Sequence, residues 1–377
     1  MTLLSWNCQG LGSLRAVRDL CQLAKENKAR ILFLMETKCS KARVEMVRVK
    51  LGFTGAFTVD PIGRSGGFAL LWKEDREVEI QNFSRRHINA VITEEGVQSW
   101  KLTGFYGHPD WAKRHEAWAL LFHLKSYTPV PWLVIGDFNK ILEQSEKDGR
   151  AQRLEAQMDL FRNTLENCQL SDLGFIGPKF TWVNSRVDGT FIWERLDCAV
   201  ANHQWCRSHG PSVVNVLAAC SSDHNPLALN ISIPKENEGR QQKGFKVEVS
   251  WMLDEEYNGI VQQAWDEGDS GDTAITTARL KLANCQADLK RWSGKKFGNA
   301  DRELKKKRNQ LLVLQSSSGT GVATDIKRLQ DEINFILEQE DMWWKQRAKQ
   351  NWYQYGTRTL LFSTPGRAIG GELTEFG

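Results

Sequence analysis

The sequence predicts an α/β fold for the first 233 of its 377 residues. Short apolar runs of strand length recur along this part of the chain, and stretches with apolar residues at helical spacing alternate with them. Gly-rich turns separate the two kinds of segment. Such an alternation is typical of sheets that are covered by helices.

The predicted elements follow from these patterns in chain order. The strands are predominantly apolar runs, at residues 3–6, 31–35, 68–72, 101–106, 132–135, 196–200 and 227–233. The helices repeat apolar residues every three or four positions, at residues 13–26, 111–124 and 154–165. Ser13 is the predicted cap of the first helix, because a serine oxygen accepts backbone N–H groups at a helix start.

Beyond residue 233 the pattern changes from strands to helices. A polar, glycine-punctuated stretch (KENEGRQQKG) precedes long segments that fit amphipathic helices. We therefore predict an α/β domain at 1–233, a linker at 234–250, an α-helical connector at 251–355 and an irregular tail at 356–377. Residues 281–310 hold ten Lys and Arg against three Asp and Glu. This excess indicates either a solvated helix face or contact with nucleic acid or a protein partner.

The composition excludes several classes of protein. With 41% hydrophobic and 25% charged residues, the chain has the composition of a soluble globular protein. No apolar run approaches the ~18 residues of a membrane helix, so we expect no membrane-spanning segment. The start shows no secretory signal, and the eight cysteines include no C-x-x-C pair, which predicts free thiols and an intracellular location. A formal net charge of +4 does not by itself indicate nucleic-acid binding.

Polar residues lie at the ends of several predicted strands, where side chains from different strands can meet at one edge of a sheet. They are Asn7, Glu36, Tyr106, Asp137, Asn139, Asp197, Asp223 and His224. None is specific alone, since a strand-end carboxylate can be solvated, an Asp–Asn pair can close an Asx turn, and a tyrosine can belong to the core. Their convergence would make a site.

Two of the carboxylates suit particular tasks. Glu36 follows five apolar residues, so its carboxylate lies at the rim of a buried strand, where a hard divalent cation fits. In the GDFN segment, Gly136 permits a close turn, and an extended chain would place Asp137 and Asn139 on one face. A carboxylate beside a side-chain amide can hold and deprotonate a water molecule.

His224 needs a partner from elsewhere in the chain. Its neighbour Asp223 points to the opposite face of an extended chain, so the two do not bond each other. We expect Asp197 to fix the imidazole tautomer and keep it protonated toward a phosphate, which leaves Asp223 free to face a metal. Tyr106 is expected at a strand exit, because the following Gly-His-Pro cannot continue a regular strand.

Six motifs in this order resemble the endonuclease/exonuclease/phosphatase superfamily, which includes the apurinic-type DNA endonucleases: WNCQGLG, FLMETK, GFYGHP, VIGDFN, RLDCAVAN and SDHNPL. The resemblance covers nearly all of residues 1–233. It implies a four-layer α/β sandwich, with two β-sheets packed face to face between helices and an active site at one edge. It also implies that Glu36 binds Mg²⁺ (or Mn²⁺), that Asp223 lies near the metal, and that Asn7 supports the metal-binding carboxylate.

The same resemblance implies the remaining catalytic roles. Asp137 would activate the attacking water and Asn139 would orient it. His224 would contact the scissile phosphate with Asp197 behind it, and Tyr106 would stabilise the transition state or the leaving oxygen. Cleavage of a phosphodiester develops charge on its oxygens, which a metal and a cationic imidazole stabilise.

A narrower resemblance is to the endonuclease domain of plant LINE-type, non-LTR retrotransposon polyproteins, carried by WNCQGLGS, METK, GGFALLW, GDFNKIL, FTWVN and RLDCAVANHQW. The segments FKVEVSWML, LKRWSGKKFGN and WWKQRAKQNWYQYGTRT look like the connector that precedes the reverse transcriptase. The chain has no pair of adjacent aspartates, so we expect an element truncated before the polymerase. Gln9 stands where apurinic-type enzymes usually carry an acidic residue, which argues against abasic-site repair and leaves the number of metal ions open.

These observations predict a Mg²⁺-dependent endonuclease that nicks duplex DNA, and hence a nuclear location. A second interpretation keeps the fold but takes abasic-site DNA, RNA or a phosphorylated small molecule as the substrate. A third interpretation is a noncatalytic remnant whose basic helices bind nucleic acid or a partner. A steep loss of activity with salt would separate a DNA enzyme from an enzyme with a small anionic substrate.

Overall fold

The structure is a computed structural model of the chain. It describes residues 1–63, 65–73, 77–94, 97–125, 130–149, 152–185, 191–210, 212–232, 251, 254–267, 274–296, 298–316, 322–355 and 374–375. The chain divides into two compact units. One contains Met1–Lys235, Asn309–Asn334 and Gly370–Gly377, and the other contains Glu236–Arg308 and Phe335–Ile369.

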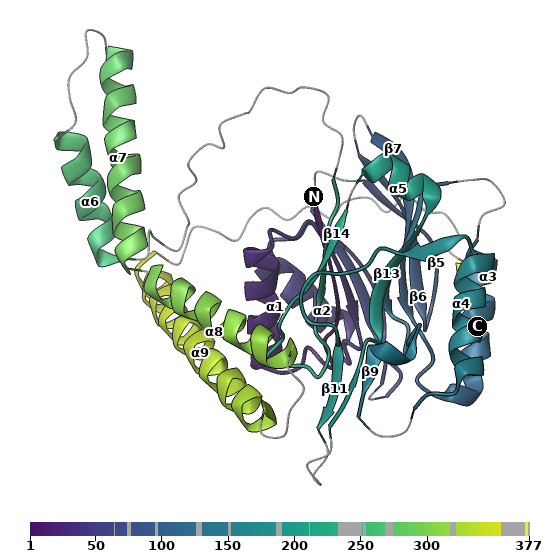
Figure 1. The fold of residues 1–377 in the computed structure, drawn as a ribbon. Coiled ribbons are helices and arrows are strands. Elements are labelled where there is room, and N and C mark those ends of the chain that lie inside the picture. Colours follow the sequence, from purple (N-terminus) through teal and green to yellow (C-terminus); the bar gives the residue numbers. More distant parts are fainter. Residues whose placement is uncertain are drawn as a thin grey trace. The chain divides into compact units, whose positions relative to one another are not determined.

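The first unit is built around two mixed β-sheets (Figure 1). The first sheet has the order β14 (Val213–Val216), β15 (Leu227–Asn230), β1 (Thr2–Asn7), β2 (Ile31–Met35), β4 (Phe68–Trp72) and β3 (Gly55–Val59). The second has the order β10 (Leu170–Asp172), β13 (Asp197–Asn202), β8 (Trp132–Asp137), β7 (Val97–Tyr106), β6 (His87–Glu94), β5 (Glu77–Ser84) and β16 (Thr374–Glu375). A small third sheet joins β11 (Trp182–Ser185), β12 (Phe191–Glu194) and β9 (Lys147–Asp148).

Helices cover the outer faces of both large sheets, which gives four layers (Figure 1). The helices α1 (Leu14–Glu26) and α2 (Lys41–Leu51) pack on the first sheet, and α3 (Arg114–Leu124) and α4 (Glu155–Asn167) pack on the second. A short helix, α5 (His203–His209), follows β13. The predicted four-layer α/β sandwich is therefore confirmed.

Alternation along the strands explains the layers. In β1, Leu3 belongs to the core between the sheets, whereas Leu4 belongs to the core under α1 and α2. In β2, Phe33 belongs to the core between the sheets and Leu32 to the core under the helices. Both faces of these strands are buried, so they form continuous apolar runs. Burying each such side chain contributes roughly 1.5–3 kcal/mol.

The predicted strands and helices are all present, with ends that shift by a few residues. Ser13 caps α1, since its side-chain oxygen accepts the N–H of Ala16 at 3.1 Å. The predicted helix at 111–124 begins with a 3₁₀ turn, Trp111–Lys113, and becomes α-helical at Arg114. Several strands were not predicted, including β5 and β6, because their polar and apolar residues alternate without a continuous apolar run.

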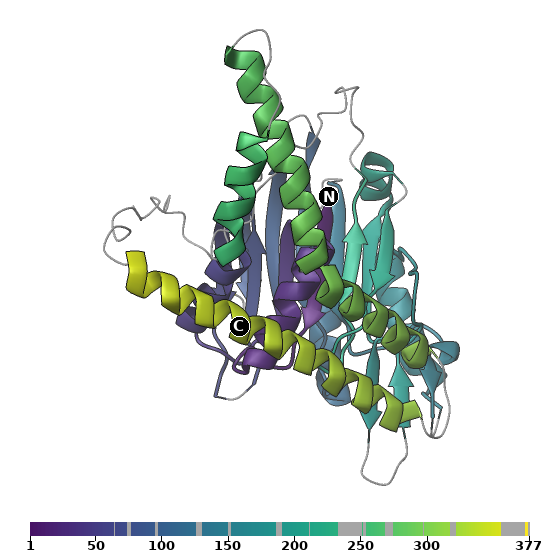
Figure 2. The same cartoon turned by 90° about the vertical axis from the view of Figure 1, so that its left-hand side faces the viewer.

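Among the described residues of the range 251–355 there are four helices: α6 (Glu255–Asp266), α7 (Ala274–Lys296), α8 (Gly298–Ser316) and α9 (Val322–Tyr355). The long helices α7 and α9 are seen along their lengths in Figure 2. Antiparallel packing of α6 and α7 is shown by contacts between Trp292 and Glu256 (2.8 Å) and between Cys285 and Val261 (3.6 Å). The predicted linker at 234–250 lies outside the described residues, as does most of the predicted tail at 356–377. The domain boundaries remain predictions.

Two expectations from composition can be compared with the structure. Among the described helices, none combines the length and the apolarity needed to cross a membrane. All eight cysteines lie in described segments, and each is a free thiol.

Candidate active site

The ends of two pairs of parallel strands bring the predicted residues together. Asn7 ends β1, and Glu36 follows the neighbouring parallel strand β2. Tyr106 and Asp137 end the parallel strands β7 and β8 and are paired in register. Parallel strands end at the same edge of a sheet, so each sheet delivers two polar side chains to one edge of the sandwich.

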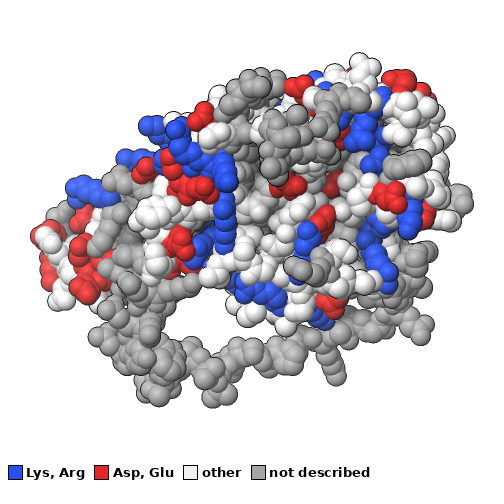
Figure 3. Space-filling view, turned by 90° about the horizontal axis from the view of Figure 1, so that it is seen from below, with Lys and Arg blue, Asp and Glu red and all other residues white. Residues whose placement is uncertain are grey.

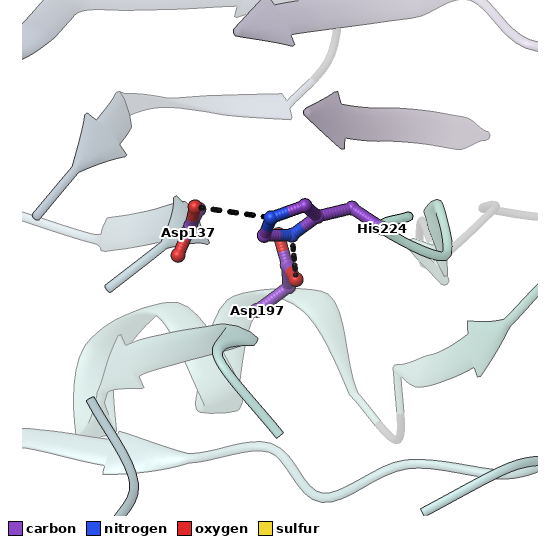
Figure 4. A group of neighbouring side chains, drawn as sticks. All are labelled: Asp137, Asp197 and His224. Atoms are coloured by element: carbon purple, nitrogen blue, oxygen red, sulfur yellow. Dashed lines mark hydrogen bonds and ion pairs between the residues drawn. The ribbon is translucent and has the colours of Figure 1, made fainter. Parts of the chain in front are cut away.

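His224 lies between two buried aspartates (Figure 4). Asp197 begins β13, which is antiparallel to β8, and it faces Asp137 in register. The imidazole Nδ1 of His224 is 2.9 Å from Asp197 Oδ2, and its Nε2 is 3.9 Å from Asp137 Oδ2. All three side chains are at most 5% exposed. The expected pairing of His224 with Asp197 is therefore present.

The Asn7 amide links these residues to Glu36. Its Nδ2 is 3.1 Å from Asp137 Oδ2, 3.4 Å from Glu36 Oε1 and 3.5 Å from His224 Nε2. The Tyr106 hydroxyl donates a hydrogen bond to Glu36 Oε1 at 2.6 Å. Glu36 and His224 thus belong to one network rather than to separate surfaces.

This network joins the two sheets. Asn7, Glu36 and His224 come from or next to strands of the first sheet, and Asp137, Tyr106 and Asp197 lie in the second. The bonds Asn7–Asp137, Glu36–Tyr106 and His224–Asp197 each pair one residue from either side.

Two site residues differ from their predicted geometry. The chain is not extended at Asn139, whose φ is +53°, and its N–H donates to Asp137 Oδ1 at 2.8 Å. The same-face argument was therefore wrong, and the Asx turn considered as its alternative is present. The Asn139 amide donates to Gly107 O at 3.1 Å. Asp223 lies next to His224, but its Oδ2 accepts a hydrogen bond from the Trp182 indole at 3.0 Å.

Gly136 has a different role from the predicted one. It lies within β8 rather than in a turn, with a φ of +151°. A Cβ atom at this position would lie 2.0 Å from Phe105 O on the neighbouring strand. The absence of a side chain therefore lets β7 and β8 approach each other just before both end at the site.

Unusual backbone conformations concentrate at the same edge. In the described part of the chain, six residues other than glycine have a positive φ, and four of them are Gln9, Glu36, Lys38 and Asn139. Such conformations cost about 1–3 kcal/mol each and persist where the surroundings enforce them, which is common at functional sites.

The buried charges shift the protonation equilibria of the site. Burial raises the pKa of Asp137, and the negative charge of Asp197 raises it further. Burial would lower the pKa of His224, but the charges of Asp197 and Asp137 outweigh burial and raise it. The geometry thus favours an imidazolium at His224 and a carboxyl group at Asp137 that titrates closer to neutrality than a free aspartate.

Glu36 has a different electrostatic environment. Burial alone would raise its pKa, but hydrogen bonds from Tyr106 and Lys38 outweigh burial and lower it. The Lys38 ammonium is 2.9 Å from Glu36 Oε2 and 3.5 Å from Gln9 Oε1. Burial also raises the pKa of Tyr106, followed by the charge of Asp137, so its hydroxyl remains a hydrogen-bond donor.

Thr181 positions both halves of the His–Asp pair, a role that was not predicted. Its hydroxyl accepts the backbone N–H groups of Leu196 and Asp197 at 3.0 and 2.9 Å. Its carbonyl accepts the N–H of Asn225, the residue after His224, at 2.7 Å. The FTWVN motif contained this residue, but the sequence does not show which backbone groups a buried threonine contacts.

Asp19 of α1 was missed for a similar reason. It is fully buried, and its Oδ2 accepts hydrogen bonds from Cys220 N, Ser221 N and Ser221 Oγ at 2.8, 3.1 and 2.9 Å. The next residue, Ser222, accepts the N–H of His224 at 3.1 Å. Asp19 thus holds the loop that carries the histidine.

The donor atoms fit a hard cation. Ligand atoms of Asp137, Asp197 and His224 all lie within 4.8 Å of one another. However, an imidazolium cannot bind a metal, and Asp197 stabilises that form of His224. The Asn7 Oδ1 and Asp223 Oδ1 atoms are buried and lack a hydrogen-bond partner among the described residues. Asn7 Oδ1 belongs to the amide that contacts the Glu36 and Asp137 carboxylates, and these oxygens together make a set of the kind that Mg²⁺ and Mn²⁺ prefer.

The four-layer sandwich thus carries this polar network at one edge. The chain belongs to the Endonuclease/Exonuclease/phosphatase family, which it matches over residues 4–224. No curated protein matches the chain.

Several solved structures are similar to this chain. The endonuclease domain of TRAS1, a telomere-specific non-LTR retrotransposon, is 19% identical with a TM-score of 0.46, covering 62% of this chain and 99% of that one. The 3′ phosphatase NExo from Neisseria, bound to product DNA hairpin, is 17% identical with a TM-score of 0.47 and the same coverage. An AP endonuclease from Archaeoglobus fulgidus is 19% identical with a TM-score of 0.48, covering 62% of this chain and all of that one.

Proposed function

We propose that this chain is a divalent-metal-dependent phosphodiesterase that nicks duplex DNA, as the endonucleases of non-LTR retrotransposons do. The observation that carries the proposal is the buried His224–Asp197 pair, joined through Asn7 to Asp137 and Glu36. The retrotransposon motifs support DNA as the substrate, and a DNA substrate supports a nuclear location.

Glu36 would hold the metal ion, with Asn7 Oδ1 as an adjacent oxygen ligand and Asp223 close by. When bound, a Mg²⁺ or Mn²⁺ ion supplies positive charge to the phosphate oxygens. Lys38 contacts Glu36 at 2.9 Å and therefore competes with a cation for this carboxylate.

His224 would face a nonbridging oxygen of the scissile phosphate through Nε2. Asp197 holds Nδ1 at 2.9 Å, so the tautomer and the ring orientation are fixed. Because the pKa of His224 is raised, the ring carries a positive charge before substrate binds. A preorganised cation of this kind stabilises the charge that develops in the transition state.

Asp137 would accept a proton from the attacking water. Its raised pKa brings it closer to neutral pH, where a general base works most efficiently. Asn139, held in the Asx turn, would orient the water. Tyr106 donates its single O–H to Glu36 at 2.6 Å and would fix that carboxylate, or would donate to the leaving oxygen instead.

Plasmid nicking tests the proposal. Purified protein with supercoiled plasmid and Mg²⁺ should yield nicked circles, and EDTA should abolish the reaction. Asp137→Asn should lower the rate by roughly 10²–10⁴, which is the typical contribution of a general base. The matched control is Asp159→Asn, because Asp159 is 55% exposed. A parent-like rate for Asp137→Asn would refute the assignment.

Substrate panels separate the related activities. A DNA enzyme should lose kcat/KM steeply as salt rises, because each phosphate contact releases counterions. Preference for abasic-site DNA, RNA or a phosphorylated small molecule over intact duplex would replace the proposed substrate while keeping the chemistry. Binding that survives EDTA without cleavage would instead indicate a noncatalytic protein.

A further inference from the structure

Two basic side chains share one buried glutamate beside the site. Glu194 is 1% exposed, and its carboxylate contacts Arg153 at 2.7 and 3.1 Å and Lys147 at 2.5 Å. Burial would raise the pKa of Glu194, but these two cations outweigh burial and lower it. One carboxylate therefore serves two cations.

Two further cations lie nearby without a carboxylate partner. Lys140 is 5% exposed, and its ammonium donates to the neutral Gln157 Oε1 at 2.8 Å. Arg114 is half-buried and donates to the carbonyls of His108 and Pro109 at 3.1 and 3.2 Å. Within the described ranges, neither Lys140 nor Arg114 forms a salt bridge.

The four cations form one electrostatic group, which we call the cation cluster: Arg114, Lys140, Lys147 and Arg153. The pKa of Lys140 is lowered to about 8, first by burial and then by the charges of Arg114 and Arg153. Burial and the charge of Arg153 also lower the pKa of Arg114. The negative charges of Glu194 and Asp137 offset part of this decrease. Among the described residues Glu194 is the carboxylate that forms ion pairs with this cluster, so the four cations leave a local excess of positive charge that a bound anion would stabilise.

The cation cluster adjoins the catalytic residues through the backbone. Lys140 directly follows Asn139, and the Asn139 amide donates to Gly107 O. The next residues along the chain, His108 and Pro109, have the carbonyl groups that accept from Arg114. Glu194 ends β12, three residues before Asp197. Lys and Arg side chains occupy several patches of the face seen in Figure 3, with acidic side chains among them. An anion bound at the cation cluster would therefore lie next to the scissile phosphate that the proposed function places beside Asp137.

We propose that Arg114, Lys140 and Arg153 bind a second phosphate, next to the scissile one on the same nucleic-acid strand. This inference rests on the proposed nuclease function. Arg side chains suit the site, because the guanidinium matches two phosphate oxygens at once. The cations come from separate chain segments, since Arg114 begins α3, Lys140 follows β8 and Arg153 precedes α4. A strand that continues past the scissile phosphate supplies the anion they need.

The test compares substrates with and without a neighbouring phosphate. Arg114→Gln and Lys140→Met are assayed on duplex DNA and on bis(p-nitrophenyl) phosphate, which has one phosphodiester only. We expect the ratio of kcat/KM for duplex to kcat/KM for the single phosphodiester to fall about tenfold in each variant. The change should appear mainly in the KM for duplex, and the salt dependence should weaken by a slope of about 1. Arg207→Gln, at an exposed position of α5, is the matched control and should keep the parental ratio.

Other outcomes overturn the inference. A parental ratio in both variants, or an equal fall on both substrates with a lower melting temperature, would mean that the cation cluster serves the fold alone. A different result would be that the parent turns over a small bisphosphate faster than duplex DNA and that the variants raise the KM for the bisphosphate only. This result would assign the second phosphate to a small molecule. If the parent nicks no DNA, the proposed function fails. Fluorescence anisotropy with a duplex in EDTA then decides the inference separately, since unchanged binding in both variants would overturn it.

Discussion

Replacing Asp197 by Asn tests the central electrostatic argument. The variant keeps the size of the side chain but removes the negative charge 2.9 Å from the His224 ring. Two unit charges at this distance attract each other by about 6 kcal/mol at an effective dielectric constant of ~20. The cost of burying both groups offsets part of this attraction, and removing one member of a buried pair typically costs ~3–5 kcal/mol.

The expected kinetic effect follows from this range. If ~3–4 kcal/mol of transition-state stabilisation is lost, kcat falls by about 10²–10³. The pH profile should change as well, because Asp197 is the main group that raises the pKa of His224. Without it the imidazolium loses its proton at a lower pH, so the alkaline limb of kcat/KM should move toward neutral pH.

The assay is plasmid nicking at saturating Mg²⁺, with kcat and kcat/KM measured between pH 5 and 10. Asp159→Asn is again the control, since its carboxylate pairs with Arg162 on the surface. The reasoning is refuted if Asp197→Asn keeps kcat within threefold of the parent and its alkaline limb does not move.

Three further predictions follow from other parts of the structure. Burial, together with the charge of Lys101, lowers the pKa of His87 from 6.5 to about 4, so the neutral ring is favoured. The free energy of unfolding should therefore fall by about 3 kcal/mol as the pH falls from 6.5 to 4, and this loss should be absent in His87→Gln. Gly136→Ala should destabilise by about 3 kcal/mol or more in urea unfolding, because its Cβ would meet Phe105 O at 2.0 Å, whereas Gly12→Ala has open space. Lys38→Met removes the ammonium that contacts Glu36 and should lower the Mg²⁺ concentration for half-maximal nicking about threefold.

Each of these predictions has a contradicting result. Parallel stability curves for the parent and His87→Gln below pH 6.5 would mean that the ring is not held neutral. An unfolding midpoint for Gly136→Ala equal to that of Gly12→Ala would contradict the close approach of β7 and β8. For Lys38→Met, an unchanged or higher Mg²⁺ requirement would contradict competition at Glu36, with Lys41→Met as the exposed control.

The residues of the candidate site could be located from the sequence because strand ends can be found from apolar runs. Asn7, Glu36 and Asp137 each follow a buried run, and parallel pairing then gathers them at one edge. The pairing of His224 with Asp197 followed from side-chain alternation, which excluded Asp223 as its partner. These inferences rest on the positions of the strand ends, on the alternation of side chains along a strand and on the parallel pairing of neighbouring strands.

What could not be predicted depends on tertiary contacts. The turn at Asn139 is set by its N–H bond to the Asp137 carboxylate, and a sequence does not choose between that turn and an extended chain. Thr181 contacts backbone groups more than ten residues away. The cation cluster draws on Arg114 and Arg153, which are far apart in sequence, so an overall charge of +4 concealed it.

The division of the network between the two sheets has a consequence for inactivation. Each sheet alone carries only half of the reactive groups, and the halves meet only while the apolar interior between the sheets stays in place. Slight sliding of one sheet over the other would separate Asn7 from Asp137 and Glu36 from Tyr106 without breaking a strand. Heating should therefore abolish turnover at a lower temperature than it melts the secondary structure.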